Sequence, residues 1–385
     1  MGSEKLFDGC VVVDATCQGP EVLSGSEGLP TSKGILLFSD ENRTPVQLLI
    51  AANMRRSAKT RLWHEKNETP SKRADIGRIV RKVYYRSCYN DFNTTLTCVR
   101  TAKSLFSDSW GEIVKLPRAV CVSIDLCAKW PFFCVTEKID INGSVKSFGP
   151  FPSRKAAIEF AGVLERGFGL CQRPDLIGTD DKYKTCPYLQ MGSCPGPCAG
   201  KISREGYLGQ IKNAVDAATG NGQRYVEEFG REMERLGGEM LFEEAEVVKG
   251  RIEAIERLQK KTFSWTGDLE ELAVLHIDRS AKVRGKDKRK RVQTFAGFLI
   301  TGRSVYRFKD FDIDGIEKFR SGLLERLGGT GDIDDDGLSD KERIGLLCSY
   351  LYRNSRQGFW LDVSERGKMP EAEWIAASLK KVFEL

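Results

Sequence analysis

The chain has 385 residues, 60 Lys and Arg against 54 Asp and Glu, only 2 His, 12 Cys and a net charge of +6. Its longest apolar run, near residues 48–52, is far shorter than the roughly 18 residues that a membrane-spanning helix needs, and Glu4 and Asp8 stand where a signal peptide carries only positive charge. These features argue against a membrane protein, His-rich metal sites and most His-based catalysis, and they predict a cytoplasmic protein with reduced cysteines.

The first 145 residues mix strand-like and helical patterns, which predicts an α+β unit. Two short apolar runs, residues 34–38 and 47–50, flank a polar segment that contains Asn42 and Pro45, a pattern typical of a β-hairpin. Helices are predicted at residues 53–61 and 74–81, and further strands at residues 11–13, 119–123 and 132–135.

The middle of the chain is predominantly helical. Ser153 can cap a helix over residues 154–168, and a Pro-, Gly- and Cys-rich loop follows as far as Gly200. A long helical region begins at Ser203 and is broken at residues 220–222 and 237–238. Its last part repeats apolar residues on one helical face, which predicts a two-helix hairpin; these residues are Leu241, Ala245, Val248, Ile252 and Ile255.

The last part of the chain predicts a second α+β unit. Strands are expected at residues 272–277, 294–300 and 304–308, with helices at residues 314–327 and 339–353. A basic stretch, residues 279–291, connects the first two strands. The segment from Asp332 to Gly337 begins like a calcium loop, but Arg343 occupies the twelfth position where a bidentate Glu is needed, so a solvated acidic loop is predicted.

Four cysteines lie in the loop-rich part of the middle segment: Cys171, Cys186, Cys194 and Cys198. Thiolates brought together by a short loop with many Gly and Pro residues suit either a tetrahedral zinc ion or an iron–sulfur cluster. Four unrelated reduced thiols are the alternative, but free Cys is usually buried in strands and helices, whereas these stand among Pro, Gly, Lys and Asp. The spacing does not separate zinc from iron–sulfur.

The same segment resembles the UvrC family, whose members are the incision subunits of bacterial nucleotide excision repair. The resemblance lies in Cys186-x-Tyr-x-Gln-x-Gly-x-Cys194-x-x-Pro-Cys198, in the following Gly200-Lys201-Ile202-Ser203 with Tyr207, and in Phe148-Gly-Pro-Phe-Pro-Ser153. Leu241-Phe-Glu-Glu-Ala245 resembles the UVR motif of that family, and residues 29–35 resemble its entry into a GIY-YIG nuclease domain.

This resemblance implies four segments and two binding sites. The segments are a degenerate GIY-YIG-like domain (residues 1–145), a linker helix with the Cys-rich segment (146–202), a UVR-type helical hairpin (203–262), and an α+β unit similar to the start of the family's RNase H-like C-terminal half (263–385). It implies that Cys171, Cys186, Cys194 and Cys198 hold a [4Fe-4S] cluster, with zinc as the alternative. It also implies that Phe242, Glu243, Glu244 and Ala245 bind a UvrB-like helicase subunit, with Phe242 as the anchor.

The residues of a GIY-YIG catalytic site are missing from the corresponding positions. Leu36 and Gln47 stand where the two Tyr residues belong, and Ile50 and Ser57 stand at the Lys and Arg positions. The metal-binding Glu falls near Thr97, where there is no carboxylate. We therefore predict a retained fold without catalytic residues and without a divalent cation for nuclease activity. The family's endonuclease and helix-hairpin-helix regions are expected to lie beyond the end of this chain.

Two basic segments are candidates for contact with DNA. Residues 55–86 hold eleven basic residues and three acids, and residues 279–291 hold eight basic residues and one acid. The first segment includes aromatic residues, and within it Arg55, Arg56, Lys59 and Arg61 are the predicted DNA-binding residues. For the second segment, a DNA contact and a charged loop tip stay equally open.

The sequence leads to one main hypothesis and two alternatives. The main hypothesis is a UvrC-like iron–sulfur protein of nucleotide excision repair that binds UvrB and DNA and has an inactive GIY-YIG site. The first alternative is an active metal-dependent incision subunit that uses non-standard residues or a separate chain for the endonuclease. The second is a metal-stabilised adaptor outside repair that keeps only the hairpin as an interaction module.

Overall fold

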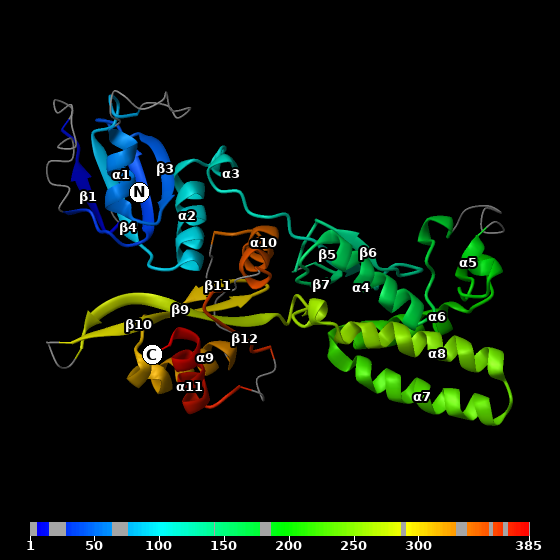
Figure 1. Ribbon diagram of the computed structural model, residues 1–385. Helices are drawn as coiled ribbons and strands as arrows, with labels where there is room; N and C mark the ends of the chain where they lie inside the picture. The colour runs from blue at the N-terminus through cyan, green and yellow to red at the C-terminus, as the bar shows by residue number, and fades with distance from the viewer. Residues whose placement is uncertain are drawn as a thin grey trace.

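The computed structural model describes residues 6–14, 28–63, 76–141, 143–177, 186–285, 290–328, 337–353, 357–364 and 369–384. Within these residues the chain forms three four-stranded sheets with helices packed on them, so the predicted α+β class is confirmed. Figure 1 shows two lobes. One contains the first and last sheets, and the other contains the middle sheet and the helices α6 (Arg204–Asp216), α7 (Gly222–Gly238) and α8 (Phe242–Glu256).

The first sheet has the strand order β1-β4-β2-β3, with a helix on each face. Its elements are β1 (Gly9–Val12), β2 (Gly34–Ser39), β3 (Pro45–Ala51), α1 (Met54–Leu62), β4 (Lys82–Ser87), α2 (Asp91–Leu105) and the short α3 (Trp110–Ile113). Strands β2 and β3 pair antiparallel as the predicted hairpin, and α1 matches the helix predicted at 53–61. The helix predicted at 74–81 is wrong for its described part: Ile79 and Val80 close one turn onto the Ile76 carbonyl before the chain enters β4.

Side chains of β2 alternate between the two helices, as expected for a strand covered on both faces. Leu36 and Phe38 share a core with Met54 of α1, whereas Ile35 and Leu37 join the core of α2. No sequence pattern predicted α2, which begins at an Asn90 cap and connects the first sheet to the last.

The middle lobe combines a sheet of order β6-β5-β7-β8 with a helical array. Its elements are β5 (Cys121–Ile124), β6 (Cys134–Thr136), β7 (Lys146–Gly149), α4 (Arg154–Gly167), α5 (Pro187–Gln190), α6 (Arg204–Asp216), α7 (Gly222–Gly238), α8 (Phe242–Glu256) and β8 (Gly267–Asp268). The hydroxyls of Ser153 and Ser203 accept hydrogen bonds from the first turns of α4 and α6. The sequence predicts the Ser153 cap, and for Ser203 it predicts only that a helical region begins there. Between α6 and α7 the helix kinks at Gly220, whose φ of 112° suits only glycine.

The last sheet has the order β11-β10-β9-β12. Its elements are β9 (Ala273–Arg284), β10 (Arg291–Thr301), β11 (Val305–Arg307), α9 (Ile316–Gly328), α10 (Asp340–Leu351), β12 (Phe359–Asp362) and α11 (Ala372–Phe383). Helices α9 and α11 pack on one face of this sheet, and α10 and α2 pack on the other. The basic stretch is therefore not only a connection, because Arg279, Lys282 and Arg284 belong to β9 and Arg291 belongs to β10.

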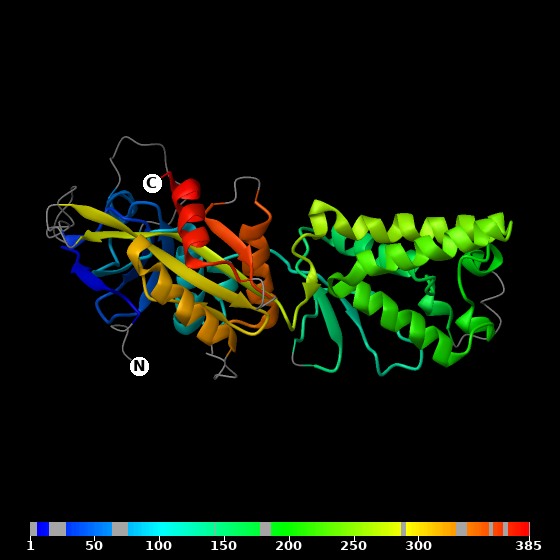
Figure 2. The same ribbon diagram turned by 90° about the horizontal axis from the view of Figure 1, so that it is seen from below.

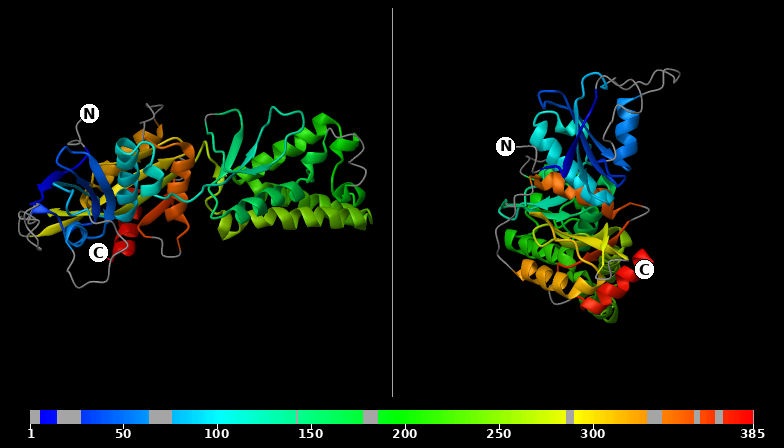
Figure 3. Two further views of the ribbon diagram at one scale, coloured as in Figure 1. Left: turned by 90° about the horizontal axis from the view of Figure 1, so that it is seen from above. Right: turned by 90° about the vertical axis from the view of Figure 1, so that its left-hand side faces the viewer.

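The first and last parts of the chain share one core. Phe92 of α2 lies edge-on to Phe298 of β10, with ring centroids 5.0 Å apart, and also to Tyr350 of α10 and Trp360 of β12. Figures 2 and 3 show the middle lobe extending to one side of this joint core. The chain thus leaves the first lobe after α3, forms the middle lobe, and returns to the first lobe at β9.

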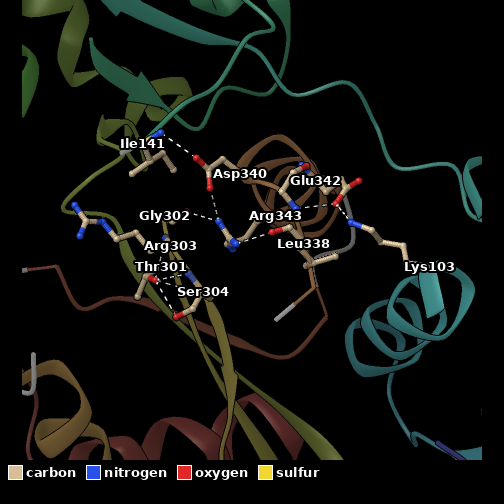
Figure 4. A network of polar contacts seen from close by, with 11 residues as sticks. Lys103, Ile141, Thr301, Gly302, Arg303, Ser304, Leu338, Asp340, Glu342 and Arg343 are labelled. Carbon is tan, nitrogen blue, oxygen red and sulfur yellow. Dashed lines mark hydrogen bonds and ion pairs between the residues drawn. The ribbon is translucent and has the colours of Figure 1, made fainter. Parts of the chain in front are cut away.

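A buried arginine fixes the place where the two lobes meet (Figure 4). Arg343 of α10 is 4% exposed, and its guanidinium donates hydrogen bonds to the carbonyls of Gly302 at 2.6 Å and Leu338 at 2.9 Å. It also donates to the Asp340 carboxylate at 2.9 Å, whose other oxygen accepts the Ile141 N–H of the middle lobe at 2.9 Å. The acidic loop predicted over residues 332–337 lies outside the described residues except for Gly337.

Candidate functional site

The positions that correspond to a GIY-YIG site do not converge. Leu36 and Gln47 lie on the α1 side of the first sheet, where Leu36 is completely buried in the apolar core. Thr97 lies on α2, which packs on the other face, and its hydroxyl donates to Asn93 at 3.5 Å. Ile50 is 45% exposed on β3 and carries no charge. These positions therefore provide neither a proton carrier nor a shared metal site.

The predicted DNA-binding residues on α1 differ in their accessibility. Arg56 and Lys59 are exposed. Arg55 is half-buried and its Nε donates to the Leu29 carbonyl at 2.9 Å. Arg61 is 8% exposed and its Nε donates to the Gln47 amide oxygen at 2.5 Å, so its guanidinium is directed at the sheet. Only Arg56 and Lys59 of these four present their charges fully to solvent.

The four cysteines of the middle lobe come from the loops around two short helices, at the end of the lobe near α5 and α6 (Figure 1). Cys171 follows α4, Cys186 directly precedes α5, and Cys198 lies in a single helical turn framed by Gly196 and Gly200. Both glycines have positive φ, which permits the sharp backbone bends that bring this loop back on itself. Cys171, Cys186 and Cys194 are buried and Cys198 is half-buried.

Hydrogen bonds and mutual repulsion show that these thiols are neighbours. The Cys171 thiol and the Cys194 sulfur share a hydrogen bond, which holds the pKa of Cys194 below its usual range, assisted by the backbone N–H groups of Gly196 and Gln172. The same bond and burial raise the pKa of Cys171. Burial and the nearby Cys194 raise the pKa of Cys198. Backbone N–H groups directed at sulfur are a feature of thiolate metal centres.

The donor set fits the metal centres that the sequence suggests, because four thiols suit either zinc or an iron–sulfur cluster. Among the described residues, no three Cys, His, Asp or Glu side chains lie close enough together to hold a metal ion as the loop stands. Tyr207 of α6 packs against the Cys-rich segment. It is completely buried in the same core as Cys171 and Cys194, and its hydroxyl donates to the Pro131 carbonyl at 3.2 Å. The loop is thus attached to α6 at its base.

The hairpin of α7 and α8 presents an apolar tip. Met240, Leu241 and Phe242 are 76%, 40% and 67% exposed, and Val247 is 58% exposed one turn later. Glu243 and Glu244 are exposed beside them in the first turn of α8, and Ala245 is half-buried. The opposite face of α8 is attached to the lobe, because Val248 and Ile255 are buried. The predicted anchor Phe242 therefore lies outside the hairpin's own core.

A polar cavity of about 480 Å³ lies between the first and last sheets, and no sequence pattern indicated it. Lys33 and Asp91, which form an ion pair, line it from one side, and Asp278 and Arg279 of β9 line it from the other. Burial raises the pKa of Asp278 to about 6. Asp312, which is not among the residues that line this cavity, caps a helical turn by accepting the Gly315 N–H at 2.9 Å.

Comparison with known proteins identifies the middle lobe. Residues 120–217 match the family model of the UvrC/Cho excinuclease middle domain, and this range contains all four clustered cysteines. The chain is similar to proteins named UvrABC system protein C. The protein of that name from Helicobacter pylori (strain P12) is 27% identical over 62% of this chain and 40% of its own length. The one from Caldanaerobacter subterraneus is 24% identical over 89% of this chain and 55% of its own length.

The similarity extends beyond the middle domain but covers only part of each relative. UvrABC system protein C from Alkalilimnicola ehrlichii is 32% identical over 34% of this chain and 22% of its own length. The chain spans about half or less of the length of these UvrC relatives. No solved structure matches the chain. Among the described helices, none is both long enough and apolar enough to cross a membrane.

Proposed function

We propose that this UvrC-related chain is a cytoplasmic protein of nucleotide excision repair that binds a UvrB-like helicase subunit and DNA and does not use its GIY-YIG-like domain for cutting. The observation that carries the proposal is the match of residues 120–217 to the UvrC/Cho middle domain, together with UvrC relatives that align over as much as 89% of the chain. Three features of the structure support its parts, and each can be tested separately.

The hairpin tip supports binding of a helicase subunit. A two-helix hairpin that leaves a Phe 67% exposed, with Met240 and Leu241 beside it, has an unpaired apolar surface, and such surfaces commonly mark protein contacts. Glu243 and Glu244 border it and would select a basic rim on the partner. The proposed contact is therefore one aromatic anchor surrounded by acidic residues.

The test compares two Phe→Ala variants in the same lobe. Phe242→Ala is expected to weaken binding to purified UvrB by tenfold or more, since a buried aromatic anchor contributes about 2 kcal/mol or more. Phe132→Ala is the matched control, because Phe132 is 41% exposed but lies outside the hairpin. Equal affinity of Phe242→Ala and the unaltered chain would refute the anchor assignment. Absence of UvrB binding by the unaltered chain would favour an adaptor outside repair.

We also propose that Cys171, Cys186, Cys194 and Cys198 hold a [4Fe-4S] cluster, with zinc as the alternative. The support is the set of four thiols, three of them buried, and the backbone N–H groups directed at Cys194. When bound, the centre would crosslink the loop and stabilise this end of the lobe.

The metal is tested by absorption in the visible range and by iron and zinc content of the anaerobically purified chain. Cys198→Ser is expected to lose the metal, because three ligands remain. Cys127→Ser is the control, since Cys127 is exposed and far from this loop in sequence. Full metal content in Cys198→Ser, or loss in both variants, would contradict the ligand assignment.

We propose that the GIY-YIG-like domain does not incise DNA. The support is Leu36, which is buried at the position of a catalytic Tyr. The test is a nicking assay on damaged duplex with Mg²⁺ or Mn²⁺ and UvrB. We expect no incision that depends on this domain. Incision that is lost in Arg55→Ala or Arg56→Ala would show a working site built from non-standard residues.

A further inference from the structure

Strands β9 and β10 continue beyond their sheet as a two-stranded arm. The arm comprises residues 281–285 and 290–293 of the described chain, and its two sides pair Lys282 with Gln293, Val283 with Val292, and Arg284 with Arg291. Figures 1 and 2 show the paired strands running past α9 and α11 to one end of the molecule. No arm residue belongs to an apolar core among the described residues. The arm is therefore not held in place by burial.

The base of the arm is held in a defined geometry. The pairing shifts by one residue between Gln293 and Phe295, which marks a bulge where the arm leaves the sheet. The Thr294 hydroxyl donates to the Ala281 carbonyl at 2.5 Å, and the Gln293 amide donates to the Ser280 carbonyl at 2.8 Å, so side chains satisfy the backbone at the bulge. Just before it, Arg279 is hydrogen-bonded to the Phe383 carbonyl and lies over the Phe383 ring. A bulge whose backbone carbonyls accept hydrogen bonds from side chains in this way fixes the direction of the arm.

Positive charge is gathered on one face of the arm. Directly paired residues on an antiparallel ribbon point to the same face, so Lys282, Arg284 and Arg291 share a face with Gln293, while Val283 and Val292 occupy the other. All three basic residues are exposed, and none forms an ion pair with any residue of the described chain. Lys290 adds a further exposed cation where its carbonyl closes the ribbon onto Gly285.

The pairing of Arg284 with Arg291 is unfavourable unless an anion lies between them. Like charges directly opposite each other on neighbouring strands destabilise the pair. Protection of exposed strand edges against aggregation uses charged side chains, especially Lys, but it does not require two cations directly opposite each other. A row of cations of one sign on one face instead matches a polyanion with regularly spaced charges.

We propose that the arm binds the sugar–phosphate backbone of duplex nucleic acid through Lys282, Arg284 and Arg291. A two-stranded ribbon can enter the major groove, which is roughly 12 Å wide, and the charged face then meets the phosphates that border the groove. This site lies outside the UvrC middle-domain match and far along the chain from the predicted DNA-binding helix α1. The proposal adds a specific site to the DNA-binding part of the proposed function, and it depends on that part alone.

The test measures how binding of the full chain to a fluorescently labelled 30-base-pair duplex DNA of mixed sequence depends on salt. The arm variant is K282Q/R284Q/R291Q. The control K318Q/K380Q/K381Q removes the same charge from exposed lysines of α9 and α11. Each lost phosphate contact lowers the slope of log K against log salt by about 0.9, so the arm variant should lose about 2 to 3 from the slope and at least about tenfold in affinity at 50 mM salt. The control should keep the slope of the unaltered chain.

A charge-conserving variant, K282R/R284K/R291K, should retain the slope, which separates phosphate contact from disruption of the ribbon. An unchanged slope in the arm variant, or equal losses in arm variant and control, would overturn the proposal while leaving DNA binding elsewhere intact. Competition by poly-L-glutamate equal to that of duplex DNA at the same charge concentration would overturn the assignment to nucleic acid. No duplex binding by the unaltered chain would overturn both the arm and the DNA-binding part of the proposed function.

Discussion

Arg343 lies at the junction of the two lobes, and its replacement by Met should strongly destabilise the folded chain. The guanidinium is 4% exposed and donates to two carbonyls and one carboxylate, at 2.6, 2.9 and 2.9 Å. Met fills a similar volume but leaves the Gly302 and Leu338 carbonyls and the Asp340 carboxylate without their donor. Removing one partner of a buried ion pair costs about 3 to 5 kcal/mol. We expect a loss of this size in the free energy of unfolding.

The assay is urea unfolding of the full chain, followed by tryptophan fluorescence and far-ultraviolet circular dichroism. Arg303→Met is the matched control in the same network (Figure 4). Arg303 forms an ion pair with Glu270 at 2.5 Å, but these side chains are 40% and 60% exposed, so its loss should cost no more than about 1 kcal/mol. Adding Asp340→Asn to Arg343→Met should recover part of the loss, because the negative charge that Arg343 no longer neutralises is removed. A cost below about 1 kcal/mol for Arg343→Met, or an equal cost for Arg303→Met, would refute the reasoning.

Three further predictions concern β9 and its neighbour β12. Burial lowers the pKa of His276 to about 3. Below pH 6.5 the His276 imidazole therefore binds a proton in the unfolded chain but not in the folded chain. The free energy of unfolding should fall as the pH drops below 6.5. His276→Phe should reduce the difference between the free energies of unfolding at pH 7 and pH 4 by on the order of 3 kcal/mol; an unchanged difference would contradict this. For Asp278 the effect of pH on stability should have the opposite sign. Burial raises its pKa to about 6, so above that pH its negative charge lowers the free energy of unfolding. Asp278→Asn should therefore stabilise the chain at pH 8 and leave it unchanged near pH 3.5, and a stabilisation equal at both pH values would disprove the electrostatic cause. Gly358→Ala should cost about 1 to 3 kcal/mol in urea unfolding, because φ is +76° and the added Cβ would lie 2.6 Å from the His276 ring; a cost near zero would show that this turn can relax.

Features that depend on neighbours in sequence were predicted well. The Ser153 cap, the start of a helix at Ser203, the β2–β3 hairpin and the kink near Gly220 all follow from residues within a few positions of one another. Capping, turn formation and glycine conformation are local effects, and they act in the unfolded chain as they do in the folded one. The apolar period predicted for α8 was met in part: Val248 and Ile255 are buried, Ala245 and Ile252 are half-buried, and Leu241 is 40% exposed.

Features that depend on pairing between distant segments could not be predicted. Strand β12 is four residues long and carries no periodic signal, and it forms only because β9, about eighty residues earlier, offers a free edge. Pairing of β9 with β10 also extends the basic stretch into strands where the sequence predicted a connection. The burial of Arg61 against Gln47 also depends on how α1 packs on its sheet.

The sequence by itself determined the family resemblance, the four clustered cysteines and the hairpin with Phe242 at its tip, because each lies within one continuous segment. The tertiary structure decided which charges are available. It buried Arg61 and Arg343, placed Asp278 in a cavity, and gathered Lys282, Arg284 and Arg291 on one exposed face. The physical reason is that the net charge of a segment is a sum over its residues. The solvation of each charged side chain, and the face on which it lies, depend instead on the strand or helix packed beside it.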